Sequence, residues 1–281
     1  MILIADAGGT SINWRMISEE GKINQAVTDG FNAYTHPKEK LRKSLEALKE
    51  NIPKEFVTKV FFYGAGLLSD ENKAIVRKEL NAILKPDYSE INHDLLAAAR
   101  SLLGNNPGIA CILGTGSNSC FYDGRQIVEN KPSLGYILGD EGSGNALGKK
   151  LLRLYYRDSL PNDLKLMFES RYRVDLLQLL KEIYTERKGP DYFAGYAKFL
   201  YDNIRHPSVY QMVYEEFAVF FDTIIAQYKN AESNIVSFCG GIAYNYANIL
   251  RQVANDKGFP IRTIVENPIA GLALYHQNND L

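Results

Sequence analysis

Short apolar runs separated by turn residues open the chain and predict a three-strand meander. The runs Ile2–Ala5, Ser11–Ile17 and Ile23–Thr28 have the length and composition of strands. Gly8–Gly9 and Glu19–Lys22 lie between them and are typical of tight turns. Each strand should therefore pair with the next one along the chain.

Helical spacing follows the meander. Pro37 suits the first turn of a helix, and Leu41, Leu45 and Leu48 recur on one face, opposite lysines and glutamates. A β-rich run comes next, at Val57–Tyr63.

The pattern then alternates between helix and strand. Ser69 is a suitable N-cap for a helix that extends to about Leu84. Tyr88–Ile91 predicts a short strand and Leu95–Leu103 a short helix.

The opening pattern returns in the second part of the chain. Ile109–Leu113, Asn118–Tyr122 and Gln126–Glu129 are strand-like. Gly114–Gly116 forms a second glycine turn, and Asp123-Gly124 is a hairpin signal. We interpret this repetition as two related lobes, each opening with a meander.

Residues 142–230 are predicted to be mainly helical. Two apolar stripes in this region are interpreted as core rather than as a cofactor site: Leu176, Leu177, Leu179, Leu180 and Ile183, and Phe217, Phe220, Phe221, Ile224 and Ile225. The last predicted elements are a strand at Ile235–Phe238, a turn at Gly240–Gly241, a helix at Tyr244–Asn255, a strand at Ile261–Val265 and a helix from Pro268 to about His276.

Alternating strands and helices indicate an α/β protein. The loop Gly104–Gly108 contains Asn-Asn-Pro-Gly and is a good boundary. We therefore expect one lobe over residues 1–107 and a second over 108–267, with the helical insertion inside it. The final helix, residues 268–281, either stays with the second lobe or joins the first.

Composition excludes several classes of protein. The 281 residues include 32 basic and 33 acidic ones, so a net charge of -1 gives no general attraction to nucleic acid or to an anionic membrane. A hydrophobic content of 46% supports a sizeable core. Three cysteines without close spacing favour a reducing, cytoplasmic location. No leader and no apolar run of about 18 residues is visible.

Three glycine turns, each directly after an apolar strand, carry the strongest chemical signal. They are Gly8-Gly9-Thr10-Ser11, Gly114-Thr115-Gly116-Ser117 and Gly240-Gly241. Glycine allows the backbone to approach a phosphate closely, and the hydroxyl groups add donors. The set suggests a bound nucleotide. The spacing excludes a Walker A loop and a Rossmann fingerprint, and the scattered histidines form no zinc-like cluster.

Four acidic residues are candidates for chemistry. Asp6 ends the first strand and is placed to hold Mg²⁺, directly or through water. Asp94 is either a helix N-cap or a general base, and we interpret the neighbouring His93 as a structural residue. Asp140 and Glu141 are either solvated capping carboxylates or groups that recognise a substrate hydroxyl.

Taken in order, these motifs resemble the N-acetylglucosamine kinase group of the BadF/BadG/BcrA/BcrD ATPase family, in the actin-like sugar kinase superfamily. The motifs are Asp-x-Gly-Gly-Thr at the start, Gly-Thr-Gly-Ser-Asn about 100 residues later, then Gly-Asp-Glu-Gly-Ser and a late Gly-Gly. The resemblance covers essentially the whole chain. It implies two actin-like, ribonuclease H-like lobes with a nucleotide cleft between them.

The resemblance also implies roles for individual residues. ATP would be bound by Gly8, Gly9, Thr10, Ser11, Gly114, Thr115, Gly116, Ser117, Gly240 and Gly241. Asp94 matches the catalytic base, and Asn32, Asn118, Asp140 and Glu141 match sugar-contacting positions. The expected reaction is phosphorylation of N-acetylglucosamine, or a related amino sugar, at the 6-hydroxyl with ATP and Mg²⁺, and a homodimer remains open.

Two departures leave the sugar undecided and keep other functions open. Vertebrate-type enzymes tend to have tryptophans in two regions that read here Asn32-Ala33-Tyr34 and Ser133-Leu134-Gly135-Tyr136. The chain is also shorter than those enzymes. Cys111 and Cys120 lie inside predicted strands, which disfavours an iron–sulfur activator. The alternatives are an ATPase that couples hydrolysis to a partner protein, and a non-catalytic sugar sensor on the same fold.

Overall fold

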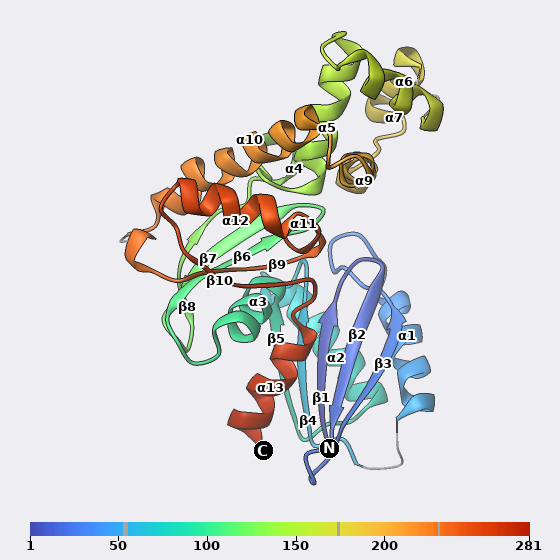
Figure 1. Ribbon diagram of the computed structural model, residues 1–281. Helices are drawn as coiled ribbons and strands as arrows, with labels where there is room; N and C mark the ends of the chain where they lie inside the picture. The colour runs from blue at the N-terminus through green and yellow to red at the C-terminus, as the bar shows by residue number, and fades with distance from the viewer. Residues whose placement is uncertain (53–55, 173–174, 230) are drawn as a thin grey trace. The chain divides into compact units, whose positions relative to one another are not determined.

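The computed structural model describes residues 1–52, 56–172, 175–229 and 231–281. It divides into two compact units. The first lobe comprises Met1–Asn106, Asp123–Ile127 and Asn267–Leu281, and the second comprises Pro107–Tyr122 and Val128–Glu266. Each lobe is built around a five-strand mixed sheet (Figure 1).

The first lobe has the predicted meander followed by parallel strands. Its elements are β1 (Ile2–Ala7), β2 (Ser11–Ile17), β3 (Ile23–Asp29), α1 (Lys38–Asn51), β4 (Lys59–Gly64), α2 (Asp70–Ile83), β5 (Tyr88–His93), α3 (Asp94–Leu103) and α13 (Ile269–Asp280). The strand order is β3-β2-β1-β4-β5. β1 pairs antiparallel with β2 and parallel with β4, which in turn pairs parallel with β5.

Helices cover both faces of the first sheet. Because side chains alternate along a strand, Leu3 and Ala5 of β1 join a core with Leu41, Leu45 and Leu48 of α1 and with residues of α2. Ile2 and Ile4 point to the other face, where they join residues of α3 and α13. As predicted, Ser69 caps α2, because its side chain accepts a hydrogen bond from the backbone N–H of Asn72.

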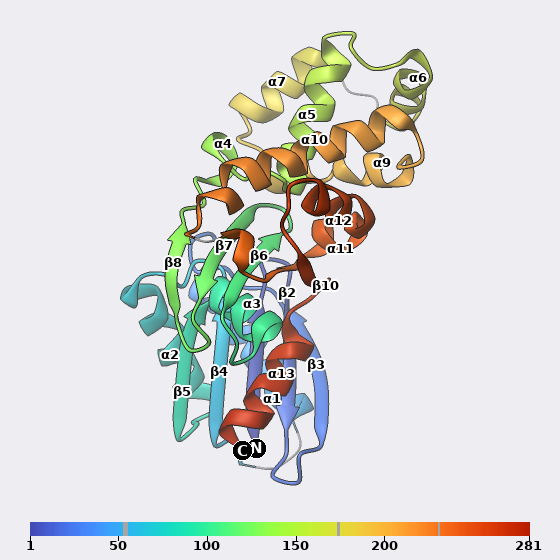
Figure 2. The same cartoon turned by 60° about the vertical axis from the view of Figure 1, so that its left-hand side comes forward.

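Helix α13, from the end of the described chain, packs on the first lobe (Figures 1 and 2). The ring of His276 stacks on Phe61 with 3.8 Å between centroids, and its Nε2 lies 2.9 Å from the hydroxyl oxygen of Tyr63. His276 Nδ1 lies 2.7 Å from the carboxylate of Asp280, and Lys59 Nζ donates to the Asp280 carbonyl at 2.6 Å. These contacts bind the last helix to β4.

The second lobe has the same strand scheme with a long helical insertion. Its elements are β6 (Gly108–Leu113), β7 (Ser117–Tyr122), β8 (Ile127–Lys131), α4 (Gly135–Leu138), α5 (Gly144–Tyr156), α6 (Asn162–Arg171), α7 (Leu176–Tyr184), α8 (Pro190–Ala194), α9 (Ala197–Asp202), α10 (Pro207–Thr223), η1 (Ile225–Gln227), η2 (Ala231–Ser233), β9 (Val236–Cys239), α11 (Gly241–Asn245), α12 (Ala247–Asp256) and β10 (Ile261–Val265). The strand order is β10-β9-β6-β7-β8. The prediction of two lobes with mixed sheets that open on a meander is confirmed.

Two predictions about helices need correction. The stripe on α7 is only partly core: Leu179 is buried, whereas Leu176 and Leu177 are 45% and 75% exposed. Leucine spacing identifies an apolar face but not whether another element covers it. The predicted helix over Tyr244–Asn255 is also two helices, α11 and α12, with a break at Tyr246.

The described residues contain no helix that is long and apolar enough to span a membrane.

The buried His276 predicts how stability depends on pH. Burial lowers the pKa of His276 from its ordinary value of 6.5, although Asp280 acts in the opposite direction. Below about pH 6.5 the folded state therefore binds fewer protons than the unfolded chain, and the free energy of unfolding should fall as the pH falls. Urea denaturation at several pH values between 5 and 8 measures this slope. His276→Gln should reduce it, and an unchanged slope would contradict the explanation.

Gly30 predicts a second stability effect, because it lies against the turn between β1 and β2. A Cβ at this position would come within 2.4 Å of the backbone nitrogen of Ser11. Gly30→Ala should therefore displace the turn and lower the free energy of unfolding by about 1–3 kcal/mol, as overpacking typically does. Gly9→Ala is the matched control, because a Cβ at Gly9 has nothing within 4 Å. Equal stability of the two variants would rule out the close approach.

Candidate active site

The candidate residues of the first lobe gather at one edge of its sheet. β1, β4 and β5 are parallel, and their register places Ala7, Gly64 and His93 side by side. The first glycine turn follows β1 directly, and Asp94 follows β5. In open α/β sheets, ligands bind beyond the carboxyl ends of the parallel strands. This edge is therefore the expected position of a ligand-binding site in the first lobe.

The first turn is held by backbone hydrogen bonds and leaves donors free. Gly8 N–H donates to Ser11 O at 2.9 Å, and the N–H groups of Gly30 and Phe31 donate to Thr10 O and Gly8 O, both at 3.0 Å. The N–H groups of Gly9 and Thr10 make no hydrogen bond within the described chain. Gly8, Gly9 and Thr10 are exposed, and Ser11 is half-buried. The turn thus offers two backbone donors to an anion.

Asp94 begins α3, but it does not cap the helix. The N-cap is His93, whose Nδ1 accepts a hydrogen bond from the N–H of Leu95 at 3.1 Å. The interpretation of Asp94 as a capping residue is therefore wrong, and the structural role of His93 is to cap. The Asp94 side chain is 41% exposed, and its Oδ1 lies 3.3 Å from His93 Nδ1. Its carboxylate is left available to a ligand.

Asp6 lies near Asp94, and both residues are half-buried. Burial, together with the negative charge of Asp94, raises the pKa of Asp6 to about 7. Two neighbouring carboxylates repel each other, and a bound cation would relieve that repulsion. Mg²⁺ typically binds through one or two carboxylates plus water and phosphate oxygens. Asp6 fits a cation that arrives with a nucleotide, and the described residues contain no cluster of three or more metal-ligating side chains.

The second turn, between β6 and β7, is braced by the start of α5. Gly144 N–H donates to Gly114 O at 2.8 Å, and Asn145 N–H donates to Thr115 O at 3.1 Å. Thr115 is exposed, Gly114 and Gly116 are half-buried, and Ser117 is buried at the start of β7. The N–H groups of Thr115 and Gly116 make no hydrogen bond in the described chain. This turn also presents two free backbone donors.

The third turn lies against the second. Gly240 has a φ of +113°, which favours glycine, and its N–H donates to Val265 O at 3.1 Å. A Cβ at Gly240 would lie 2.3 Å from Leu113 O and 3.2 Å from Gly114 N. Gly241 begins α11. The structure thus brings the second and third predicted turns together in one lobe.

The first of the two acidic residues after α4 is not a solvated cap. Asp140 is only 6% exposed, and Ser143 is the N-cap of α5. Glu141 is half-buried beside Gly139. The Asp140 carboxylate accepts hydrogen bonds from the second turn and from α5, so the sequence interpretation of a water-exposed carboxylate is wrong for this residue.

The predicted sugar-contacting asparagines belong to different lobes. Asn32 follows β3 in the first lobe, where its Oδ1 accepts from Tyr34 N–H at 2.9 Å and lies against Gly66. Asn118 lies on β7 in the second lobe, where its Oδ1 accepts from Ser119 N–H and from Asn130 Nδ2. The first lobe therefore carries Asp6, the first turn, Asn32 and Asp94, and the second lobe carries the other candidates.

Sequence reasoning missed the residues that hold the turns. Gly30 holds the first turn, and Asn145 and Ser133 contact the second turn or Asp140. A glycine that follows a strand is a weak signal for Gly30. Nothing in the local pattern marks Asn145 or Ser133, because the Thr115 carbonyl lies 30 residues from Asn145 and Asp140 lies 7 residues from Ser133.

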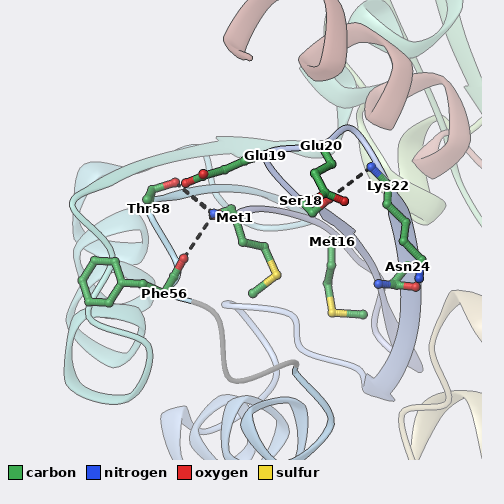
Figure 3. A pocket seen from close by; sticks show the side chains of 9 residues that line it. All are labelled: Met1, Met16, Ser18, Glu19, Glu20, Lys22, Asn24, Phe56 and Thr58. Atoms are coloured by element: carbon green, nitrogen blue, oxygen red, sulfur yellow. Dashed lines mark hydrogen bonds between the residues drawn. The ribbon is translucent and has the colours of Figure 1, made fainter.

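A cavity of the first lobe lies at the other end of its sheet. It has a volume of about 680 Å³ and is lined by Met1, Met16, Ser18, Glu19, Glu20, Lys22, Asn24, Phe56 and Thr58 (Figure 3). Met1 precedes β1, whereas the glycine turn follows it. This cavity contains none of the candidate residues.

Solved structures resemble the chain over its full length. The structure described as "Putative N-acetylglucosamine Kinase" from Porphyromonas gingivalis has a TM-score of 0.89 and 32% identity, with 100% of each chain covered. The structure of the same description from Chromobacterium violaceum has a TM-score of 0.68 and 18% identity, with 98% of each chain covered. A non-polymerising mutant of MamK bound to AMPPNP has a TM-score of 0.52 and 12% identity, and 99% of this chain and 97% of that chain are covered.

No family model matches the chain, and no curated protein matches it. The similarities below 25% identity show the fold alone, which is that of actin-like ATPases and sugar kinases. The full-length similarity at 32% identity shows the family as well as the fold. The chain belongs to the family of N-acetylglucosamine kinase-like proteins with the actin-like ATPase fold.

Proposed function

We propose that the protein is an ATP-dependent kinase that phosphorylates N-acetylglucosamine, or a related amino sugar, at the 6-hydroxyl. The observation that carries this proposal is the placement of Asp94. Its side chain does not cap the helix and is 41% exposed. The residue begins α3 at the sheet edge that also carries the first glycine turn. A solvent-accessible carboxylate at the same sheet edge as a glycine turn is suited to phosphoryl transfer to a hydroxyl.

Asp94 acts as the general base in this proposal. It orients the attacking hydroxyl and accepts its proton at a carboxylate oxygen. The sugar is contacted by Asn32, Asn118, Asp140 and Glu141, the positions that the family resemblance indicates. Positioning of the hydroxyl supplies much of the rate enhancement, because phosphoryl transfer needs little covalent chemistry from the protein.

The phosphates of ATP are assigned to the glycine turns. The free N–H groups of Gly9, Thr10, Thr115 and Gly116 would donate to phosphate oxygens and stabilise charge during transfer. The hydroxyl groups of Ser11 and Ser117 extend these turns, and Gly240 and Gly241 would lie beside the nucleoside. Asp6 would hold Mg²⁺, which when bound neutralises charge on the phosphates.

The direct test is Asp94→Asn, assayed by ADP release with and without N-acetylglucosamine. The amide cannot accept the proton, so turnover should fall by about 10²–10⁴-fold while sugar binding persists. Near-normal turnover would overturn the assignment of Asp94. The matched control is Asp70→Asn, because Asp70 likewise follows an N-cap at the start of a helix, α2. This control should keep full turnover.

The same assay on the wild-type protein separates the alternatives. ADP release that does not depend on sugar would favour an ATPase that acts on a partner protein. Sugar binding without ADP release would favour a sensor. A panel of N-acetylglucosamine, N-acetylmannosamine, N-acetylmuramic acid, glucosamine and glucose would identify the substrate.

A further inference from the structure

The carboxylate of Asp140 is used within the protein. Oδ1 accepts hydrogen bonds from Ser117 N–H at 3.2 Å and from Ser133 Oγ at 3.1 Å, and Oδ2 accepts from Asn145 Nδ2 at 2.8 Å. The residue is only 6% exposed. A carboxylate offers about four acceptor sites, so three protein donors occupy most of its capacity.

Asn145 connects this carboxylate to the second turn. The residue is fully buried, and its Nδ2 donates both to Asp140 Oδ2 and to Thr115 O, the latter at 2.7 Å. Its backbone N–H donates to the same carbonyl at 3.1 Å. One residue therefore holds the Thr115 carbonyl with two donors, and Asp140 fixes the orientation of the amide that supplies one of them.

Because of peptide geometry, the two held carbonyl groups also determine the direction of the free N–H groups of the turn. A trans peptide is planar, so its C=O and the N–H of the following residue point in opposite directions. Gly114 O and Thr115 O are both held toward the start of α5. The N–H groups of Thr115 and Gly116 belong to these same two peptides. They must therefore point away from α5, and they are available to a phosphate on that side of the turn.

Two further observations indicate that the arrangement is specific. A Cβ at Gly116 would lie 2.9 Å from Asp140 Oδ2, so the carboxylate packs directly on the turn. Asp140 itself has a φ of +63°, a left-handed conformation that is uncommon outside glycine. Such strain persists only where the surrounding contacts enforce it, and it is frequent at functional sites.

We propose that Asp140 and Asn145 are positioning residues that hold the second glycine turn in its phosphate-binding conformation. The proposal rests on the proposed function, and it assigns Asp140 first to the nucleotide and only then to the sugar. Preorganised donors bind an anion more tightly than donors that must reorganise. Loss of either side chain should therefore weaken nucleotide binding even when no sugar is present.

The test measures the Kd of AMPPNP by calorimetry, without sugar, for Asp140→Asn and Asn145→Ala. Each variant loses a hydrogen bond of the network, and we expect the Kd to rise about tenfold or more in both. The double variant should lose less than the product of the two single effects, because the side chains share one hydrogen bond. Thermal unfolding of every variant establishes that it is folded.

Ser143→Ala is the matched control. Ser143 is buried and caps α5 through Ala146 N–H, and within the described residues its side chain makes no hydrogen bond to the turn. Its replacement should cost stability, as loss of a cap does, and leave the Kd of AMPPNP within about twofold. An equal loss of nucleotide affinity in the control would reduce the effect to a general loosening of α5 and overturn the proposal.

Steady-state kinetics separate this proposal from a role in sugar binding alone. If Asp140→Asn raises the KM for N-acetylglucosamine while its Kd for AMPPNP stays within twofold, Asp140 is a sugar ligand and the inference fails, although the kinase function stands. If the wild-type protein binds AMPPNP but transfers no phosphoryl group to any sugar, the kinase function fails. A rise in Kd in the two variants would then still support the positioning role.

Discussion

The topology of each sheet depends on one strand that pairs antiparallel on one side and parallel on the other. β1 and β6 both have an antiparallel neighbour, which returns through a glycine turn, and a parallel neighbour on the other side. The turn therefore lies at the same edge as the carboxyl ends of the parallel strands. In the first lobe this constraint alone brings the turn after Ala7 to the edge where β5 ends and Asp94 begins. In the second lobe the same pairing brings together the second and third glycine turns of the chain, which are in contact at Gly240.

The two lobes share this scheme but hold their turns differently. The first turn is held by backbone groups of Gly30 and Phe31, which follow β3. The second is held by the start of α5, with the side chains of Asn145 and Asp140 buried behind it. Backbone contacts need only a glycine that permits close approach, whereas side-chain contacts require specific chemistry. We therefore expect substitutions to disturb the first turn mainly by steric overlap and the second turn mainly by the loss of hydrogen bonds.

The features that depend on local periodicity could be predicted from the sequence. The features that depend on contacts between distant parts of the chain could not. The bounds of β2 and the cap at Ser69 followed from alternation and from capping chemistry, and the fold class followed from the repeated meander. His93 displaced Asp94 as the cap because an imidazole nitrogen can accept the same N–H, which local rules do not favour. The burial of Asp140 depends on Ser117, 23 residues away, and the exposure of Leu177 depends on which elements fail to cover α7. The roles of the candidate residues remain predictions.

The packing of α13 also has a consequence for how the chain folds during synthesis. Ile2, Ile4 and Phe61 emerge early from the ribosome, but their core includes Ile269, Leu272 and Ala273, which are made more than 200 residues later. The second lobe is complete at Glu266, before that helix exists. One face of the first sheet therefore stays partly uncovered until residues 269–273 have been made, after all the strands of the second lobe. The lobe that is translated first is the one that finishes last.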